Sequence, residues 1–166
     1  MKKLIIINGP MGVGKTTVSK NLFNSLKPSV LLDGDWCWNM NPFLVNEENK
    51  KMVLDNIKYM LNNYLNNSNF EYVIFCWVIP EESILEDILS ELPSNYELHK
   101  FTLTCDTETL KYRLLNDSAR QISEQTINQS ISFIPKYNLM DTTKIDSTDK
   151  NINEIVEILI SKIQKK

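Results

Sequence analysis

The chain has 166 residues, of which 42% are hydrophobic and 23% charged, and its formal net charge at pH 7 is −3. A chain of this length typically forms one domain and buries about 68–70% of the surface that it exposes when unfolded. We therefore expect a single domain over residues 1–166. The sequence contains no basic block, which argues against a duplex nucleic-acid partner, since such a partner requires a clustered positive face.

Cysteine usage and hydropathy indicate a cytoplasmic protein. Cys37, Cys76 and Cys105 are widely spaced and follow no metal-binding pattern, so reduced thiols are the expected state. The apolar run near the N-terminus stops at Asn8, too early for the apolar region of a signal peptide. No stretch approaches the ~20 apolar residues that a membrane-spanning helix needs, and we expect no membrane partner.

Hydrophobic periodicity predicts strands and helices that alternate along the chain. Leu4 to Ile7 form a continuous aliphatic run typical of a buried strand, and residues 33–42 are expected to be irregular. The helix that begins near Ser123 is expected to stop by Pro135. The further predicted strands cover residues 30–32, 71–77, 99–104 and 143–146, and the predicted helices cover 15–26, 47–66, 81–92, 107–116, 123–135 and 153–164. This alternation implies an α/β fold with an open, mostly parallel sheet.

A complete phosphate-binding loop lies between the first predicted strand and the first predicted helix. It reads Gly9-Pro-Met-Gly-Val-Gly-Lys-Thr16 and fits the pattern Gly-x4-Gly-Lys-Thr. Glycines allow successive backbone N–H groups to surround an anion, and the following helix directs its positive end to the same point. Lys15 is expected to reach the β- and γ-phosphates of ATP, and the Thr16 hydroxyl to bind Mg²⁺. The predicted nucleotide-binding residues are Gly9, Met11, Gly12, Val13, Gly14, Lys15, Thr16 and Thr17.

Reactive residue types follow the predicted strands, where a parallel sheet binds its ligands. Asp33 and Asp35 follow the second strand, Trp77 ends the third, and Asp106 follows the fourth. Residues 146–148, after the fifth strand, are expected to approach the adenine. These residues should therefore gather along one edge of the sheet.

The phosphate loop, together with Leu32-Asp33-Gly34-Asp35, resembles the small P-loop kinases of metabolites and antibiotics. Adenylylsulfate, gluconate and shikimate kinases and chloramphenicol phosphotransferase belong to this group. The chain is also similar to P-loop proteins of the tunicamycin-resistance type. The resemblance implies the three-layer P-loop NTPase fold, with a five-stranded parallel sheet of order 2-3-1-4-5, and ATP as the phosphoryl donor.

The same resemblance implies roles for the two aspartates. Asp35 would lie beside the γ-phosphate and accept the proton of an attacking hydroxyl, and Asp33 would assist Mg²⁺ or its water ligands. The alternative is turn chemistry, because Asp-Gly is common in loops.

The chain has only two arginines, Arg113 and Arg120, against sixteen lysines. Both fall where these kinases carry their lid, which we expect at residues 113–123. Arg120 is expected to close over the nucleotide, and Arg113 to neutralise charge on the transferred phosphoryl group. Either arginine is alternatively a solvated surface charge.

The arginine count also bears on the phosphoryl acceptor. Kinases of anionic substrates grip them with arginines, and none remains here once the lid has two. Trp36, Trp38 and Trp77 fall at the strand ends, which favours a small, neutral, partly flat acceptor with a hydroxyl, such as a nucleoside, an antibiotic or a sugar derivative. The alternative is that these tryptophans pack the sheet edge.

Two features of the sequence differ from those of other P-loop proteins and narrow the class of protein. The third strand ends Cys76-Trp77, without the carboxylate that helps hold Mg²⁺ in P-loop ATPases, which argues against a motor or AAA-type ATPase. Thr143-Lys-Ile-Asp146 mimics the guanine-reading motif of GTPases, but no switch motif accompanies it.

Three hypotheses remain. The first is an ATP-dependent small-molecule kinase, monomeric or homodimeric, with Lys15, Asp35, Arg113 and Arg120 as catalytic residues. The second is a nucleotide-dependent protein that sequesters a drug without phosphorylating it. The third, a polynucleotide 5′-end kinase, needs a positive channel that this acidic sequence does not indicate.

Overall fold

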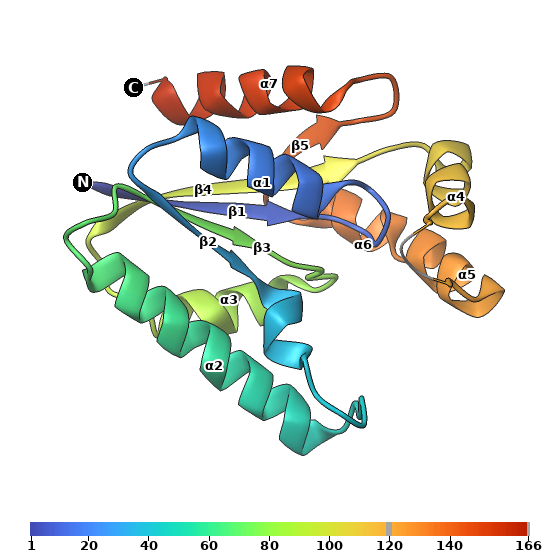
Figure 1. The fold of residues 1–166 in the computed structure, drawn as a ribbon, viewed down its shortest axis with the longest axis horizontal. Coiled ribbons are helices and arrows are strands. Elements are labelled where there is room, and N and C mark those ends of the chain that lie inside the picture. The colour runs from blue at the N-terminus through green and yellow to red at the C-terminus, as the bar shows by residue number, and fades with distance from the viewer. Residues whose placement is uncertain (119–120, 166) are drawn as a thin grey trace.

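The computed structural model describes residues 1–118 and 121–165. Its centre is a five-stranded sheet of order β2-β3-β1-β4-β5, in which every neighbouring pair is parallel (Figure 1). This is the predicted order. The strands are β1 (Lys2–Asn8), β2 (Ser29–Asp33), β3 (Tyr72–Cys76), β4 (Tyr96–Thr104) and β5 (Thr143–Asp146).

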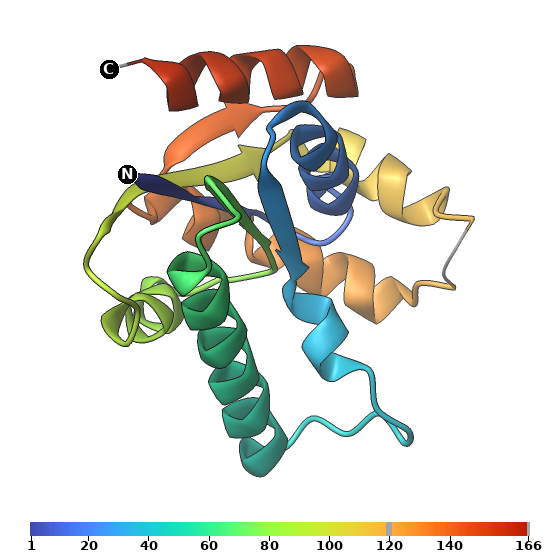
Figure 2. The ribbon, with the colours of Figure 1, turned by 60° about the vertical axis from the view of Figure 1, so that its left-hand side comes forward.

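Helices cover both faces of the sheet, as the three-layer prediction requires. Helices α1 (Lys15–Ser25) and α7 (Ile152–Gln164) lie on one face, and α2 (Glu47–Asn66) and α3 (Glu82–Ser90) on the other (Figure 1). The short helix α6 (Ile134–Leu139) packs with the second group. Helices α4 (Thr107–Leu115) and α5 (Glu124–Ser132) lie next to each other beyond the carboxyl end of β4 (Figures 1 and 2).

The aliphatic run in β1 explains why this strand is central. Ile5 and Ile7 belong to the core beneath α1 and α7, whereas Leu4 and Ile6 belong to the core beneath α2 and α3. All four side chains are fully buried. A strand covered on both faces needs apolar residues at every position, not at every second one.

In the second half of the chain the structure corrects one boundary and adds one helix. Strand β4 begins at Tyr96, three residues before the predicted start at His99, because Tyr96 already pairs with Lys2 of β1. The helix predicted to begin near Ser123 and to stop by Pro135 is α5, which ends at Ser132, but the sequence did not predict α6, which has Pro135 in its first turn. Proline is tolerated in a first helical turn, because its missing N–H has no intrahelical partner there.

Two further segments lie close to the sheet edge. Residues expected to be irregular after β2 form a short 3₁₀-helix, η1 (Gly34–Trp38). Of the predicted lid, 113–123, the structure describes the end of α4 and the approach to α5, and Arg120 lies outside the described residues.

Among the described helices, none is both long enough and apolar enough to span a membrane.

Candidate functional site

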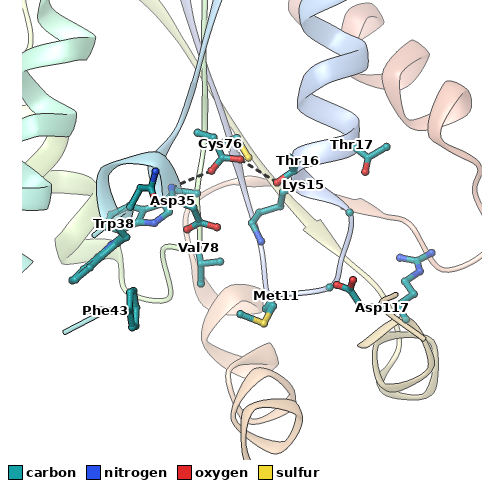
Figure 3. A pocket seen from close by; sticks show the side chains of 16 residues that line it. Met11, Lys15, Thr16, Thr17, Asp35, Trp38, Phe43, Cys76, Val78 and Asp117 are labelled. Atoms are coloured by element: carbon teal, nitrogen blue, oxygen red, sulfur yellow. Dashed lines mark hydrogen bonds between the residues drawn. The ribbon is translucent and has the colours of Figure 1, made fainter. Parts of the chain in front are cut away.

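A cavity of about 750 Å³ opens at the carboxyl edge of the sheet (Figure 3). The phosphate loop and the start of α1 form one side, and the residues after β2 and β3 form the other. The lining residues are Met11, Gly12, Gly14, Lys15, Thr16, Thr17, Asp33, Asp35, Trp38, Asn39, Phe43, Cys76, Trp77, Val78, Arg113 and Asp117. Of the residues that the sequence placed at this edge, Asp33, Asp35, Trp38, Trp77 and most of the phosphate loop line the cavity, whereas Asp106 and residues 146–148 do not.

The phosphate loop has the backbone that an anion-binding loop requires. Gly9, Gly12 and Gly14 have positive φ angles of 141°, 84° and 104°, a region that residues with a Cβ rarely adopt. Gly14 is the N-cap of α1, so the N-terminus of this helix is directed at the loop. The Lys15 ammonium lies within the loop and donates a 2.9 Å hydrogen bond to the Pro10 carbonyl.

Thr16, Asp33 and Asp35 form a connected polar group. The Thr16 hydroxyl donates to Asp33 Oδ2 at 3.1 Å, and the Asp35 amide donates to Asp33 Oδ1 at 3.1 Å, as Figure 3 shows. Asp33 is buried, whereas Asp35 is exposed to the cavity. The hydrogen bond from the Asp35 amide to Asp33 is the turn chemistry of the alternative interpretation. The hydrogen bond from Thr16 to Asp33 is not part of that turn, because it joins the start of α1 to the end of β2.

This group fits a Mg²⁺ ion bound together with a nucleotide. A hydroxyl and a carboxylate oxygen at one point are the hard ligands that Mg²⁺ prefers, and phosphates and water complete its shell in nucleotide sites. Among the described residues there is no cluster of three or more metal-ligating side chains. Thr16 and Asp33 are thus suited to supplement a metal–nucleotide complex, not to hold a bare ion.

Cys76 ends β3 beside this group, where the sequence lacked a carboxylate. The thiol is 1% exposed, and burial, followed by the charge of Asp33, raises its pKa to about 11 despite the nearby Lys15. Cys76 is therefore a neutral thiol at neutral pH and adds no negative charge to the site.

The far side of the cavity from the phosphate loop is aromatic. Trp38, Phe43, Trp77 and Val78 line it together with Asp35, and Figure 3 shows Trp38 and Phe43 on the side of the cavity away from Thr16 and Thr17. Trp38 and Trp77 were predicted from the sequence. Phe43 was missed, because no strand precedes it.

Trp77 has a packing role as well as a place at the cavity. A Cβ built on Gly34 would lie 2.4 Å from Cγ of the Trp77 indole. The indole is packed directly on the glycine backbone, so the middle residue of Asp33-Gly-Asp35 needs a bare Cα. Trp36, in contrast, is 55% exposed and does not line the cavity. The structure therefore does not bring this predicted substrate-binding residue to the site.

Asn8, which the sequence analysis did not select, holds the loop that follows β3. Its side chain accepts from the Ile79 N–H and donates to the Ile79 carbonyl, both at 2.9 Å. It is fully buried and immediately precedes the phosphate loop. Asn8 thus fixes the loop bearing Trp77 and Val78 to the end of β1. The sequence did contain one sign of this role, because Asn8 is a polar residue directly after the aliphatic run Leu4 to Ile7.

Arg113 connects the phosphate loop to the loop after β5. Its guanidinium donates to the Ser147 hydroxyl at 2.9 Å, to the Ser147 carbonyl at 2.8 Å and to the Val13 carbonyl at 3.3 Å. In the same loop, hydrogen bonds from the Thr148 N–H and hydroxyl hold the pKa of Asp146 below its usual range. The structure therefore brings together residues 146–148 and Arg113, which also lines the cavity.

Helix α5 supports the phosphate loop from outside the motif. The Ser130 hydroxyl donates to the Met11 carbonyl at 3.0 Å, and Ser130 is 6% exposed. Nothing in the sequence near Ser130 signals this contact, because the partners lie 119 positions apart in the chain.

The fold and the loop define a P-loop nucleotide-binding protein. Residues 5–131 match a family model described as an AAA domain, and the chain belongs to that family. The match identifies the family of the domain. The expectation against an AAA-type ATPase concerns its reaction, rests on Cys76 in place of a carboxylate, and stays a prediction. Comparison with curated protein sequences found no match.

Solved structures share the fold over nearly the whole chain. The tunicamycin resistance protein of Deinococcus radiodurans is 18% identical with a TM-score of 0.68, and the match covers 100% of this chain and 98% of that one. A gluconokinase from Sinorhizobium meliloti 1021 is 14% identical with a TM-score of 0.71, over 96% and 90% of the two chains. Shikimate kinase from Acinetobacter baumannii is 18% identical with a TM-score of 0.68, over 98% and 93%. The chain thus resembles small P-loop kinases, as predicted from its sequence.

Proposed function

We propose that the protein is an ATP-dependent phosphotransferase that moves the γ-phosphate of ATP to a hydroxyl of a small, neutral molecule. The observation that carries this proposal is the composition of one cavity, in which Lys15 and Thr16 face Asp35 and an aromatic wall. A cation for phosphates and a carboxylate for a hydroxyl proton are the two groups that in-line phosphoryl transfer requires.

The proposed reaction assigns one task to each group. Lys15 and the amides of residues 9–14 bind the phosphates, and Thr16 and Asp33 are the residues that would hold Mg²⁺, which supplies charge neutralisation when bound. The Asp35 carboxylate accepts the proton of the acceptor hydroxyl. The hydroxyl oxygen forms a bond to the γ-phosphorus as the bond to the ADP oxygen breaks.

The arginines complete the proposal. Arg113, anchored on Ser147 and Val13, borders the nucleotide half of the cavity and is proposed to stabilise charge there. We expect Arg120 to close over the nucleotide. The other half of the cavity is lined by Asp35, Trp38, Asn39, Phe43 and Trp77. None of these five residues is basic, which supports a neutral acceptor, since arginines commonly bind anionic ones.

The test is ADP release from Mg-ATP against a panel of nucleosides, nucleotides, hydroxylated antibiotics and sugars. Lys15→Ala and Asp35→Asn are the site variants, and Asp55→Asn, on the exposed face of α2, is the matched control. Turnover with a neutral alcohol that is lost in both site variants and kept in the control supports the proposal. Turnover confined to phosphorylated acceptors contradicts the neutral class.

A second candidate function is nucleotide-dependent ligand binding without phosphate transfer. It is favoured by the match to a tunicamycin resistance protein over nearly the full length of both chains. Tight ligand binding in the presence of ATP, with no ADP formed from any acceptor and no effect of Asp35→Asn on ligand affinity, would select it.

A further inference from the structure

The segment between η1 and α2 carries three consecutive exposed apolar side chains. Phe43 is 67% exposed, Leu44 51% and Val45 53%. We call these residues the 43–45 strip. Single exposed apolar residues are ordinary, but a contiguous group at the rim of a cavity marks a surface for an apolar ligand.

The strip is continuous with the cavity. Phe43 belongs to both, because it lines the cavity and begins the strip. Its ring lies 5.9 Å from that of Trp38 at an interplanar angle of 53°, and Trp38 itself packs on the core. Figure 3 shows Trp38 and Phe43 on the same side as Asp35, away from Thr16 and Thr17. A ligand bound in the cavity at Asp35 can therefore also contact Phe43, the first residue of the strip.

The strip is held in place by its flanking polar residues. The Asn49 side chain donates to the Leu44 carbonyl at 2.8 Å, and the Asn49 N–H is capped by the Asn46 side chain at 2.8 Å. Fixing the backbone between Phe43 and α2 in this way lowers the entropy lost when a ligand binds to the strip.

Charge defines the kind of ligand. Between Asp35 and Glu47 the sequence contains no charged residue. Asp35, which precedes this uncharged segment, lines the cavity. The side chains of residues 36–46 therefore offer an anionic group no counter-ion, whereas Phe43, Leu44 and Val45 offer a hydrocarbon group a surface away from water.

From these observations we infer that the acceptor has two parts, a hydroxyl-bearing head that enters the cavity at Asp35 and an uncharged hydrophobic group that covers Phe43, Leu44 and Val45. This inference rests on the proposed function for the head, and it extends the acceptor class from a neutral alcohol to an amphipathic one.

The test uses a neutral apolar dye, Nile red, and measures its binding by fluorescence with the non-hydrolysable analogue AMP-PNP and Mg²⁺ present. Uncharged 1,2-alkanediols of six to nine carbons then compete for the site. We expect one dye per chain, and we expect competition to strengthen by about two- to fourfold per added methylene, since each buried methylene contributes about 0.8 kcal/mol.

The variants are Phe43→Ser and the double variant Leu44→Ser/Val45→Ser, with Leu139→Ser, 87% exposed and outside the cavity lining, as the matched control. Dye affinity should fall by about tenfold in the first two and change less than twofold in the control. Equal loss in all three, or no loss in any, overturns the inference, and so does stronger competition by alkyl sulfates of the same length.

Two further results separate this inference from neighbouring possibilities. A concentration-dependent dimer in sedimentation that disappears in Leu44→Ser/Val45→Ser overturns it, because the strip then binds a second copy of the chain. Dye binding that depends on the strip, with no phosphate transferred to any alcohol, refutes the proposed function but keeps the apolar ligand site.

Discussion

The hydroxyl of Thr16, at the start of α1, donates to the carboxylate of Asp33, at the end of β2, over 3.1 Å. Seventeen positions separate the two residues in the sequence, and the parallel pairing of β1, β3 and β2 brings them together. This contact connects the phosphate side of the cavity with the aspartates on the opposite side.

Asp33→Asn should weaken the contribution of Mg²⁺ to nucleotide binding. The amide keeps the shape of the side chain but removes the anionic oxygen that a hard cation prefers. We expect the gain in affinity for a fluorescent ATP analogue on adding Mg²⁺ to shrink by about tenfold, with affinity in EDTA nearly unchanged. Asp55→Asn is the control, and an unaltered Mg²⁺ effect in Asp33→Asn would exclude Asp33 from the metal site.

Gly34→Ala should destabilise the protein through Trp77. The new methyl group would lie 2.4 Å from Cγ of the indole, and overpacking of this kind costs about 1–3 kcal/mol. Urea unfolding of Gly34→Ala, Trp77→Ala and the double variant measures the coupling. The double variant should be more stable than the sum of the single effects predicts, by at least about 1 kcal/mol. Additive effects would show that the two residues do not pack on each other.

Asn8→Ala should lower stability and loosen the loop that bears Trp77. The substitution leaves the buried N–H and carbonyl of Ile79 without their side-chain partner, at about 1–3 kcal/mol for each unsatisfied group. Urea unfolding measures the stability, and tryptophan emission reports the loop. Asn21→Ala, which removes an exposed hydrogen bond to Thr17, is the control. Equal losses in the two variants would contradict a special role for Asn8.

His99, the one histidine in the chain, should make the fold sensitive to mild acid. Burial lowers its pKa, and Lys3 adds to this effect, while Glu97 opposes it. The folded state therefore binds the proton less readily than the unfolded state, so this contribution to stability is complete above the unfolded pKa of about 6.5 and is lost as the pH falls toward the folded pKa.

The measurement is the thermal midpoint between pH 7.5 and pH 5.5. In the parent protein it should fall over this interval, and in His99→Gln it should fall less steeply. A parallel decline in both proteins would mean that His99 does not carry the pH dependence.

Much of the fold followed from local patterns. The Leu4 to Ile7 run predicted a strand buried on both faces, and the phosphate-loop motif predicted the turn between β1 and α1; both are confirmed. Pro135 predicted that the helix from Ser123 would stop before it, but not that α6 would begin there, although proline is tolerated in the first turn of a helix. Whether the chain makes the second helix depends on packing of α6 against the core.

The sequence by itself determined the class of site, because glycines, a lysine and a threonine at fixed spacing have few uses other than binding a phosphate chain. It also determined which edge of the sheet holds that site. Only the tertiary structure decided that Asn8 clamps Ile79, that Ser130 supports Met11 and that Phe43, not Trp36, reaches the cavity. These are contacts between distant segments or directions of side chains in irregular backbone, and neither is encoded in a local periodicity.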